Sequence, residues 1–421
     1  MCLNRVRSSV SLAALGCVFI SNIAVAENST EPTPADPFDF DLTNYEQTAD
    51  DKAFLFSGSI EFRHRTFTER GETLSNRVAA NLNFRWNTGN WLAFTRANFE
   101  YDGSKRAFRD PDRFELREAY VRYAFEDSQV SIGKQRIAWS TADGVGTIDR
   151  LNAVDLRDPI VDARTPSRRP SWAVLVKHSF DIGTLEAVWL PLGKDRKIAE
   201  FNSPWEPQFL NALRQPDGDA SGLLIVKDPT TDDFGLRFSR YGERIDWSAA
   251  LFNGLGDGPE EIAFVDGVTL LSPAKSTSYN LSAALGVAQS TLRGELTFTP
   301  DAVINGSRQQ QWQLVAGADR TFFTDLYVNL QLFLFSNEID SDEFGSTFLV
   351  SHGLFNDTVE VGMSGQIARD DQTALNLYFD YQVNDSIAFS TRFISFSGQS
   401  DSALGEFRQN DFIEFSALWS F

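Results

Sequence analysis

Apolar and polar residues alternate along most of the chain with a period of two. In the stretch RVAANLNFRW, Leu82, Phe84 and Trp86 alternate with Asn83 and Arg85, and similar stretches recur up to the C-terminus. A β-strand places successive side chains on opposite faces, so this pattern predicts strands with one apolar and one polar face. No stretch of comparable length shows the 3.6-residue period of an amphipathic helix.

The pattern predicts eighteen strands whose connections alternate in length. Every second connection is a tight turn, such as NTGN at 87–90 or VNDS at 383–386, whereas the others include long segments at 139–170, 192–231 and 255–275. The expected strands are 53–67, 74–87, 91–102, 114–126, 129–138, 171–180, 184–191, 232–241, 245–254, 276–288, 291–300, 309–322, 325–337, 346–356, 358–368, 373–383, 386–397 and 409–421.

Short turns on one side and longer loops on the other are typical of outer-membrane barrels. Charged residues in the middle of the polar face, such as Arg96 and Glu100, indicate a wet interior rather than the outer face of a soluble sandwich. Aromatic residues often begin and end the apolar rows, as in interfacial girdles. We therefore predict an all-β, transmembrane, antiparallel up-and-down β-barrel over residues 53–421, with about 18 strands, short periplasmic turns and long extracellular loops. A barrel of 16 strands is the alternative.

The first 26 residues differ from the rest of the chain. Arg5 and Arg7 precede an apolar run, and Ala24-Val25-Ala26 provides a small-x-small cleavage site. We expect a cleaved secretory signal peptide at 1–26, with a lipoprotein signal as the alternative. Residues 27–52 are acidic and contain three prolines, so we expect an acidic, flexible periplasmic arm there.

Composition excludes several classes of function. The chain of 421 residues has a formal net charge of −20, which disfavours nucleic acid as a partner because a phosphate footprint needs clustered cations. Both cysteines, Cys2 and Cys17, lie within the expected signal peptide, so the mature chain has no thiol chemistry. Phosphate loops, zinc signatures and dinucleotide motifs are absent from the sequence, and we expect no cofactor and no metal.

The polar face of the expected strands carries the candidate pore-lining residues. Basic residues are densest in the first four strands, and acids on the same face nearly balance them. Charges of both signs in a pore create a transverse field that orients polar solutes, although mutual pairing that stiffens the wall is the open alternative. The candidates are Glu61, Arg63, Arg65, Arg77, Arg85, Arg96, Glu100, Glu118, Arg122, Lys177, Arg237, Arg293 and Arg392.

A motif extends over the fourth and fifth expected strands and the loop after them. It consists of Arg117, Glu118, Ala119, Tyr120, Gly133, Gln135, Trp139, Asp149, Asn152 and Asp155. This pattern resembles a large, poorly characterised family of Gram-negative outer-membrane porin-like barrels. Lys134, Ser140 and Ala153 depart from that family, which has Arg, Gly and Pro there. A weaker similarity, through the same hairpin, is to alginate-export porins.

The resemblance implies that the loop 139–170 folds inward and narrows the pore, as in many porins. The loop holds aspartates and arginines in equal number, which fits a self-bonded structure against a charged wall, although an external loop can hold the same charges. The candidate constriction residues are Trp139, Asp143, Asp149, Arg150, Asn152, Asp155 and Arg157.

The predicted function is an outer-membrane channel for passive diffusion of small polar or weakly anionic solutes. A dedicated conduit for a lipid, hydrophobic compound or polysaccharide is the first alternative. An outer-membrane enzyme is the second, and we expect none, because His64, His178 and His352 are isolated. Ser351 and His352 are neighbours on one strand and point to opposite faces, so they cannot form a nucleophile–base pair.

The expected partners follow from this placement in a Gram-negative outer membrane. They are membrane lipid and lipopolysaccharide, the barrel-assembly machinery and a possible periplasmic transport partner. The chain ends in the alternating row Ile413, Phe415, Ala417, Trp419 and Phe421. This ending resembles the C-terminal signal that the assembly machinery recognises, with Phe421 as the assembly signal.

Overall fold

The computed structural model describes residues 54–104, 112–142, 145–155, 157, 168–194, 197, 199–214, 223–226, 231–256, 261–265, 268–304, 306–338 and 342–421. The expected signal peptide at 1–26 and the arm at 27–52 lie outside the described residues, so they stay predictions.

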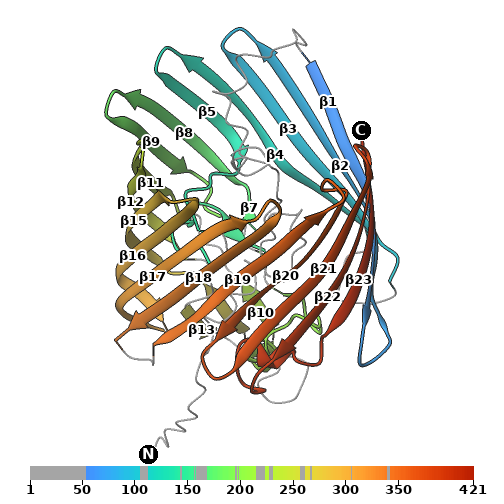
Figure 1. Ribbon diagram of the computed structural model, residues 1–421. Coiled ribbons are helices and arrows are strands. Elements are labelled where there is room, and N and C mark those ends of the chain that lie inside the picture. The colour runs from blue at the N-terminus through green and yellow to red at the C-terminus, as the bar shows by residue number, and fades with distance from the viewer. Residues whose placement is uncertain are drawn as a thin grey trace, which may run out of the picture.

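Eighteen strands form one closed antiparallel barrel (Figure 1). Each strand pairs with the next barrel strand along the chain, and β23 pairs with β1 in the register Ser59↔Ser420 to Phe67↔Phe412, which leaves no free sheet edge. The barrel strands are β1 (Phe54–Phe67), β2 (Thr73–Thr88), β3 (Trp91–Asp102), β4 (Asp112–Phe125), β5 (Ser128–Gln135), β8 (Ser171–Phe180), β9 (Gly183–Leu190), β11 (Asp233–Arg240), β12 (Ile245–Leu255), β15 (Lys275–Val287), β16 (Ser290–Ile304), β17 (Ser307–Phe322), β18 (Leu326–Asn337), β19 (Glu343–Leu354), β20 (Val359–Ala368), β21 (Gln372–Asn384), β22 (Ile387–Ser397) and β23 (Phe412–Ser420).

The predicted fold class and the count of eighteen strands are confirmed. Every second connection is a tight turn as expected, and Figure 1 shows the hairpins β2–β3, β4–β5 and β8–β9 turning at the upper end of the barrel. We call this end the short-turn rim and the opposite end the long-loop end. The connections at the long-loop end vary from short, as between Ile304 of β16 and Ser307 of β17, to long, as between β9 and β11. Several predicted boundaries were wrong. The strand expected at 129–138 ends at Gln135, because the amide of Ile137 turns to Asn152 Oδ1 instead of the neighbouring strand.

Pro300 explains another boundary error, at the end of β16. Proline has no N–H to donate to the sheet, so the predicted strand stops there. In the structure, a register shift between Thr299 and Ala302 passes the proline, and pairing with β17 resumes to Ile304. This is the local irregularity that a β-bulge produces.

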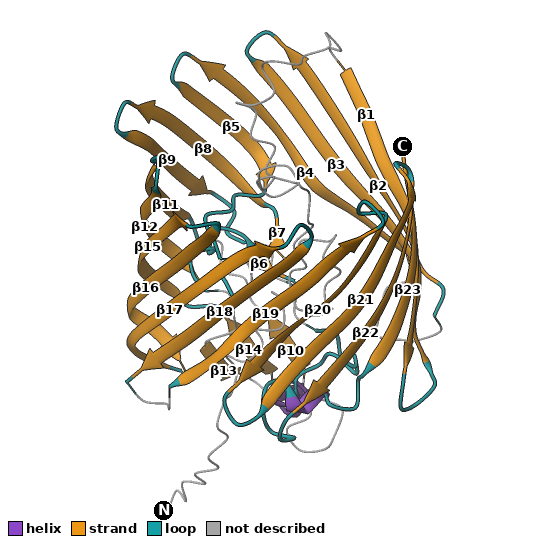
Figure 2. Cartoon of the chain, in the orientation of Figure 1, coloured by secondary structure: helices purple, strands orange, loops and turns teal. Residues whose placement is uncertain are grey.

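Smaller elements within the long loops were not predicted. They are β6 (Ala153–Val154) with β7 (Arg168–Arg169), the three-stranded sheet of β10 (Leu223–Val226), β13 (Glu261–Val265) and β14 (Val268–Ser272), the helix α1 (Gln208–Arg214) and the 3-10 helix η4 (Gly405–Phe407). Figure 2 shows α1 at the lower, long-loop end. None of the helices in the described part of the chain has the length and apolar character that a membrane crossing requires.

The barrel has an inverted distribution of polarity. On β1, Ile60 and Phe62 point outward and are 39% and 47% exposed, whereas Glu61, Arg63 and Arg65 point inward and are buried. The other barrel strands repeat this arrangement, with exposed Leu, Val, Phe and Trp outside and mostly polar residues inside. A barrel folded for water would place these two faces the other way round.

Candidate functional site

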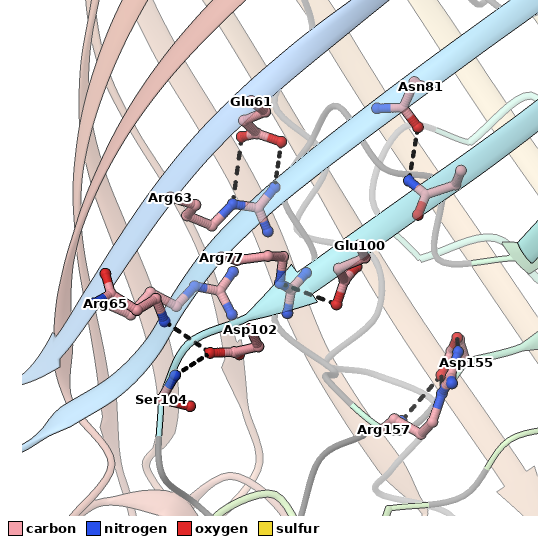
Figure 3. A network of polar contacts seen from close by, with 12 residues as sticks. Glu61, Arg63, Arg65, Arg77, Asn81, Glu100, Asp102, Ser104, Asp155 and Arg157 are labelled. Atoms are coloured by element: carbon pink, nitrogen blue, oxygen red, sulfur yellow. Dashed lines mark hydrogen bonds and ion pairs between the residues drawn. The ribbon is translucent and has the colours of Figure 1, made fainter. Parts of the chain in front are cut away.

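The candidate site is the barrel interior, where one wall is strongly charged. This charged wall comprises the inner faces of β22, β23 and β1 to β4. Arg65 Nε lies 2.6 Å from Glu414 Oε2 on the neighbouring β23, and both side chains are buried. Arg63 binds Glu61 two residues away on β1, with Nη2 2.9 Å from Oε2 (Figure 3). Buried charges are stable only when they are paired in this way.

The ion pairs continue along the neighbouring strands. Arg77 Nε lies 3.2 Å from Glu100 Oε1 across β2 and β3, as Figure 3 shows. Arg96 Nη1 lies 3.3 Å from Glu118 Oε2 across β3 and β4. The wall therefore alternates cations with anions instead of presenting uncompensated positive charge.

On the same wall, Arg392 joins the network from β22. Its Nε lies 3.9 Å from Glu414 Oε1, and its Nη2 lies 4.0 Å from Asp380 Oδ2. Glu414 thus lies among Arg63, Arg65 and Arg392, which surround it from both neighbouring strands.

The remaining pore-lining candidates lie on other parts of the inner face. Lys177 and Arg237 both bind Glu186 Oε1, at 3.0 and 3.1 Å. Arg293 on β16 forms an ion pair with Asp319 on β17. These cations are therefore also paired with carboxylates.

Arg85 and Arg122 lie nearer the short-turn rim. Arg85 Nε donates to Asn87 Oδ1 at 3.4 Å. The Arg122 guanidinium carbon lies 5.6 Å from the centre of the Tyr120 ring, and its buried Nε has no hydrogen-bond partner among the described residues. No ion pair joins Arg122 to a carboxylate among the described residues, so its positive charge is not neutralised by a neighbouring acid.

The inner loop, which comprises the described residues between β5 and β8, lies inside the barrel. Trp139 packs in an apolar cluster with inward residues such as Leu175, Val188 and Phe252. Its Nε1 donates to Glu186 Oε2 at 2.9 Å, and the Arg237 guanidinium carbon lies 5.5 Å from the centre of its ring. These contacts fix the start of the loop to β8, β9, β11 and β12.

Asp149 and Asn152 hold the loop together internally. Asp149 Oδ1 accepts the backbone N–H groups of Trp139 and Ser140, at 2.6 and 2.9 Å. Asn152 Oδ1 accepts the N–H of Ile137 at 2.8 Å, and its Nδ2 donates to the carbonyl of Arg169 at 3.2 Å. Side chains of these residue types often replace regular pairing for backbone groups in loops.

The middle of the inner loop is anchored on Glu295 of β16. Glu295 Oε1 accepts hydrogen bonds from Ser140 Oγ at 2.6 Å and from the N–H groups of Thr141 and Ala142 at 2.7 and 3.1 Å. Its Oε2 accepts the N–H of Thr147 at 2.9 Å. One buried carboxylate therefore holds the loop against a strand that is distant from β5 and β8 in the sheet.

Two further contacts place the inner loop against the inner face of the strands that follow β16. Arg150 Nη2 donates to Gln313 Oε1 on β17 at 2.7 Å. Val145 packs with the inward residues Val315, Phe333 and Phe335. The inner loop thus reaches from β5 and β8 to β16, β17 and β18 through the interior.

Asp155 and Arg157 form the part of the inner loop that faces the charged wall. Arg157 Nη2 lies 2.5 Å from Asp155 Oδ2 (Figure 3). Arg169 bridges Asp155 to Glu115 of β4. Burial alone would raise the pKa of Asp155, but Arg157 and Arg169 outweigh it and hold that pKa well below its usual value. Burial would lower the pKa of Arg157, and Asp155 instead raises it. The remaining constriction candidate, Asp143, lies outside the described residues.

A second segment, residues 199–214, crosses the long-loop end. We call it the strap. Trp205 lies in an aromatic pocket of Phe396, Phe407 and Phe412, with ring centroids 6.0, 5.9 and 6.0 Å away. Trp205 is 3% exposed. The strap belongs to the connection between β9 and β11, whereas the three phenylalanines lie on β22, η4 and β23. The contact therefore joins segments that are far apart in the sequence.

Hydrogen bonds flank this aromatic contact. Asn410 Nδ2 donates to the carbonyl of Pro204 at 2.6 Å. The N–H of Gln208 donates to Glu406 Oε2, and Gln208 Nε2 donates to the carbonyl of Ser400, both at 2.8 Å. Burial raises the pKa of Glu406 to about 7, against the hydrogen bond from Gln208 that lowers it.

The sequence pattern places Glu118 on the inner face but misses Glu115. Glu115 and Glu118 both pair with inward cations, which strict alternation forbids for residues three apart. A register shift between Arg96 and Ala97 permits it, because the bulge inserts one residue into β4. Asp319 and Trp205 were also missed. Asp319 continues the alternation of β17, whereas Trp205 belongs to a loop with no periodic signal.

Comparisons with known proteins agree with this architecture. The model of a family described as a protein of unknown function (DUF1302) matches residues 41–183, about a third of the chain. The match includes the strands and part of the loop that carry the motif. The resemblance of the motif at Arg117 to Asp155 to porin-like barrels and the weaker similarity to alginate-export porins stay predictions. No curated protein sequence matches the chain.

Solved structures of outer-membrane porins share the fold. OprD of Pseudomonas aeruginosa is 9% identical, with a TM-score of 0.53, covering 87% of this chain and 94% of its own. OccAB2 of Acinetobacter baumannii is 8% identical, with a TM-score of 0.56, covering 88% and 98%. OccD3 (OpdP) of Pseudomonas aeruginosa is 8% identical, with a TM-score of 0.55, covering 88% and 91%. At such identities the likeness concerns the fold alone.

Proposed function

We propose that the chain is an outer-membrane channel for passive diffusion of small polar or weakly anionic solutes. The observation that carries the proposal is the inverted polarity of the closed barrel. Its outer face exposes aliphatic and aromatic rows that only lipid can cover, whereas its inner face buries charged, amide and hydroxyl side chains. A polar interior within an apolar cylinder is the arrangement that moves polar solutes across a bilayer.

The inner loop and the strap supply the selectivity of this channel. The inner loop carries Asp155 and Arg157 into the interior, opposite Glu115 of the charged wall. Fixed charges of both signs admit polar solutes and oppose apolar ones. Because most wall cations are paired, we propose only a weak preference for anions, centred on Arg122, which forms no ion pair with a carboxylate among the described residues.

A dedicated conduit for a lipid, hydrophobic compound or polysaccharide is the second candidate. Apolar residues on the inner face favour it, because Val315, Phe333 and Phe335 form a buried cluster with Val145 of the inner loop. A conduit would open only with a partner, whereas a diffusion channel conducts alone.

Conductance measurements distinguish these candidates. The full-length protein, purified in detergent and added to planar bilayers, is expected to produce discrete current steps in potassium chloride. Swelling of liposomes that contain the protein should be faster in small sugars than in large ones. A silent bilayer, with correctly folded heat-modifiable protein, contradicts the diffusion channel and favours the conduit.

The expected location and partners follow the same proposal. We propose the outer membrane of a Gram-negative bacterium, with lipopolysaccharide around the long-loop end and the barrel-assembly machinery as the route of insertion. Sedimentation of the protein with outer-membrane fractions tests the location. Recovery of the native chain in the soluble fraction without detergent would contradict it.

A further inference from the structure

The most exposed large apolar side chains of the described residues lie at the tips of short turns. Phe323 is 96% exposed, Phe355 79%, Tyr241 74% and Ile182 65%. They occupy the turns β17–β18, β19–β20, β11–β12 and β8–β9, which lie along one arc of the short-turn rim. We call these four residues the apolar arc.

The rest of the rim is polar. The turn β2–β3 has Gly89 and Asn90 at its tip, the turn β4–β5 has Glu126 and Asp127, and the turn β21–β22 has Asp385 and Ser386. Apolar tips are therefore not a general property of these short turns. They are confined to the side formed by β8 to β20, where the turn β15–β16, with Ala288 and Gln289, separates Ile182 and Tyr241 from Phe323 and Phe355.

Two of the apolar tips have a backbone conformation that aromatic residues rarely adopt. Phe323 and Phe355 both have φ of 57°, in the left-handed region. Glycine and asparagine fit this region with less strain, and they are the usual residues of such turns. Glu126, Ala288 and Gln289 in other turns of the rim lie in the same region, so the feature that distinguishes Phe323 and Phe355 is the exposure of a large apolar ring at such a position.

The tips lie beyond the apolar band of the outer face. The outward rows of the same strands contain a basic residue before each tip, at His178, Arg240, Arg320 and His352. Arg320 lies over the Phe322 ring, with 4.9 Å between its guanidinium carbon and the ring centre. Basic side chains on a lipid-facing surface mark the headgroup level. Phe323 follows Arg320 toward the rim, so it lies outside the hydrocarbon.

An acidic residue accompanies each apolar tip. Asp181 precedes Ile182, and exposed or partly exposed acids follow the other three tips by two residues, at Glu243, Asp325 and Asp357. These carboxylates repel the anionic headgroups that an aromatic anchor would approach. They complement a basic protein surface instead.

We propose that the apolar arc is a docking surface for a protein that presents an apolar pocket bordered by lysine and arginine. The inference rests on the proposed outer-membrane placement, which puts this rim in the periplasm. The surface is prearranged, because the N–H of Gly353 donates to the carbonyl of Asp325 at 3.2 Å and links the turns of Phe323 and Phe355. Little ordering of the rim is then needed on binding.

Photo-crosslinking in growing cells tests the docking surface. A photoreactive benzoylphenylalanine replaces Tyr241 in the full-length chain, and a matched probe replaces Asn90 on the polar side. We expect a protein adduct of one defined mass from position 241 and none from position 90. A cross-link to lipid alone, no adduct, or equal adducts at both positions would overturn the proposal.

Paired substitutions test the chemistry of the surface. Phe323→Asn with Phe355→Asn is expected to reduce the adduct at position 241 at least tenfold. Asparagine suits the backbone of both turns, so the barrel of this double variant should still fold and remain heat-modifiable. Asp325→Lys with Asp357→Lys is expected to cause a similar loss while the aromatic tips remain. An adduct that persists in both double variants would contradict the proposed docking surface. Conductance of the purified barrel tests the channel separately, so each proposal can fail alone.

Discussion

The backbone N–H of Thr141 donates a 2.7 Å hydrogen bond to Oε1 of Glu295, and this bond ties the inner loop to a remote strand of the barrel. Ser140, Ala142 and Thr147 donate to the same carboxylate. A single side chain thus determines where the loop crosses the interior, since it accepts hydrogen bonds from four residues of the loop.

Replacement of Glu295 should release the inner loop. In Glu295→Ala the N–H groups of Thr141 and Thr147 lose their acceptor, and the buried donor of Thr147 alone costs about 1–3 kcal/mol when it is left unsatisfied. We expect larger, noisier single-channel currents and a lower temperature of the heat-modifiable transition. Glu360→Ala is the matched control, because Glu360 accepts a hydrogen bond from Tyr378 of the barrel strand β21. Identical currents in both variants would contradict an anchoring role for Glu295.

Loss of Trp205 should detach the strap without unfolding the barrel. The side chain is buried among Phe396, Phe407 and Phe412, and truncation of a buried tryptophan costs about 3–5 kcal/mol. The contact joins a loop to the wall, so Trp205→Ala is expected to speed proteolysis within 199–214 while the heat-modifiable mobility is kept. Trp172→Ala, on the outer face, is the control. Unchanged proteolysis of the strap would show that Trp205 does not hold it.

Docking of the strap should depend on pH through Glu406. Burial raises the pKa of this carboxyl from 4.5 to about 7, so the docked state holds its proton more tightly than the detached state. Docking is therefore strongest below about pH 4.5, weakens as the pH rises to about 7, and changes little above that. Distances between spin labels at the exposed positions Ala212→Cys and Gln409→Cys, measured at pH 5 and pH 8, report the docked fraction.

The Glu406→Gln variant supplies the decisive comparison for this pH effect. It cannot ionise, so the docked fraction should no longer change between pH 5 and pH 8. Glu206→Gln is the matched control, since Glu206 accepts hydrogen bonds from Asn202 and Asn211 within the strap itself. If the pH response persists in Glu406→Gln, another group is responsible.

The sequence predicts the barrel well because its signal is local and repeated. Each strand carries its own alternation, so Arg63, Arg65 and Glu100 could be placed on the inner face one strand at a time. The ion-pair partner of each charged residue cannot be predicted in this way. The pairing of Arg65 with Glu414 depends on closure between the first and last strands, and Glu115 points inward only because of a bulge. The strap contact of Trp205 depends on a loop path that no periodicity describes.

Arg122 should set the weak preference for anions. No carboxylate pairs with Arg122 among the described residues, whereas Arg96 nearby is paired with Glu118. Arg122→Glu replaces a cation with an anion, so the ratio of chloride to potassium permeability is expected to fall roughly twofold or more. Reversal potentials in a potassium chloride gradient measure it. Arg320→Gln, on the outer face, should leave the ratio unchanged, and an equal shift in both variants would contradict a local effect of Arg122.

Deletion of Phe421 should impair assembly before it impairs conduction. Its N–H donates to the carbonyl of Gly58 at 2.9 Å, and its carbonyl accepts the N–H of Gly58 at 2.8 Å, which extends the β1–β23 seam by one residue. The centre of its ring lies 5.8 Å from that of Phe56 and 5.2 Å from that of Trp419.

The deletion removes one pair of hydrogen bonds out of a long ladder, so the assembled barrel should conduct normally. We expect the heat-modifiable fraction in outer membranes to fall severalfold, with unchanged conductance per channel. Phe421→Tyr, which keeps the aromatic ring, should restore the fraction. Normal assembly of the deletion would show that the C-terminal aromatic residue is not the assembly signal.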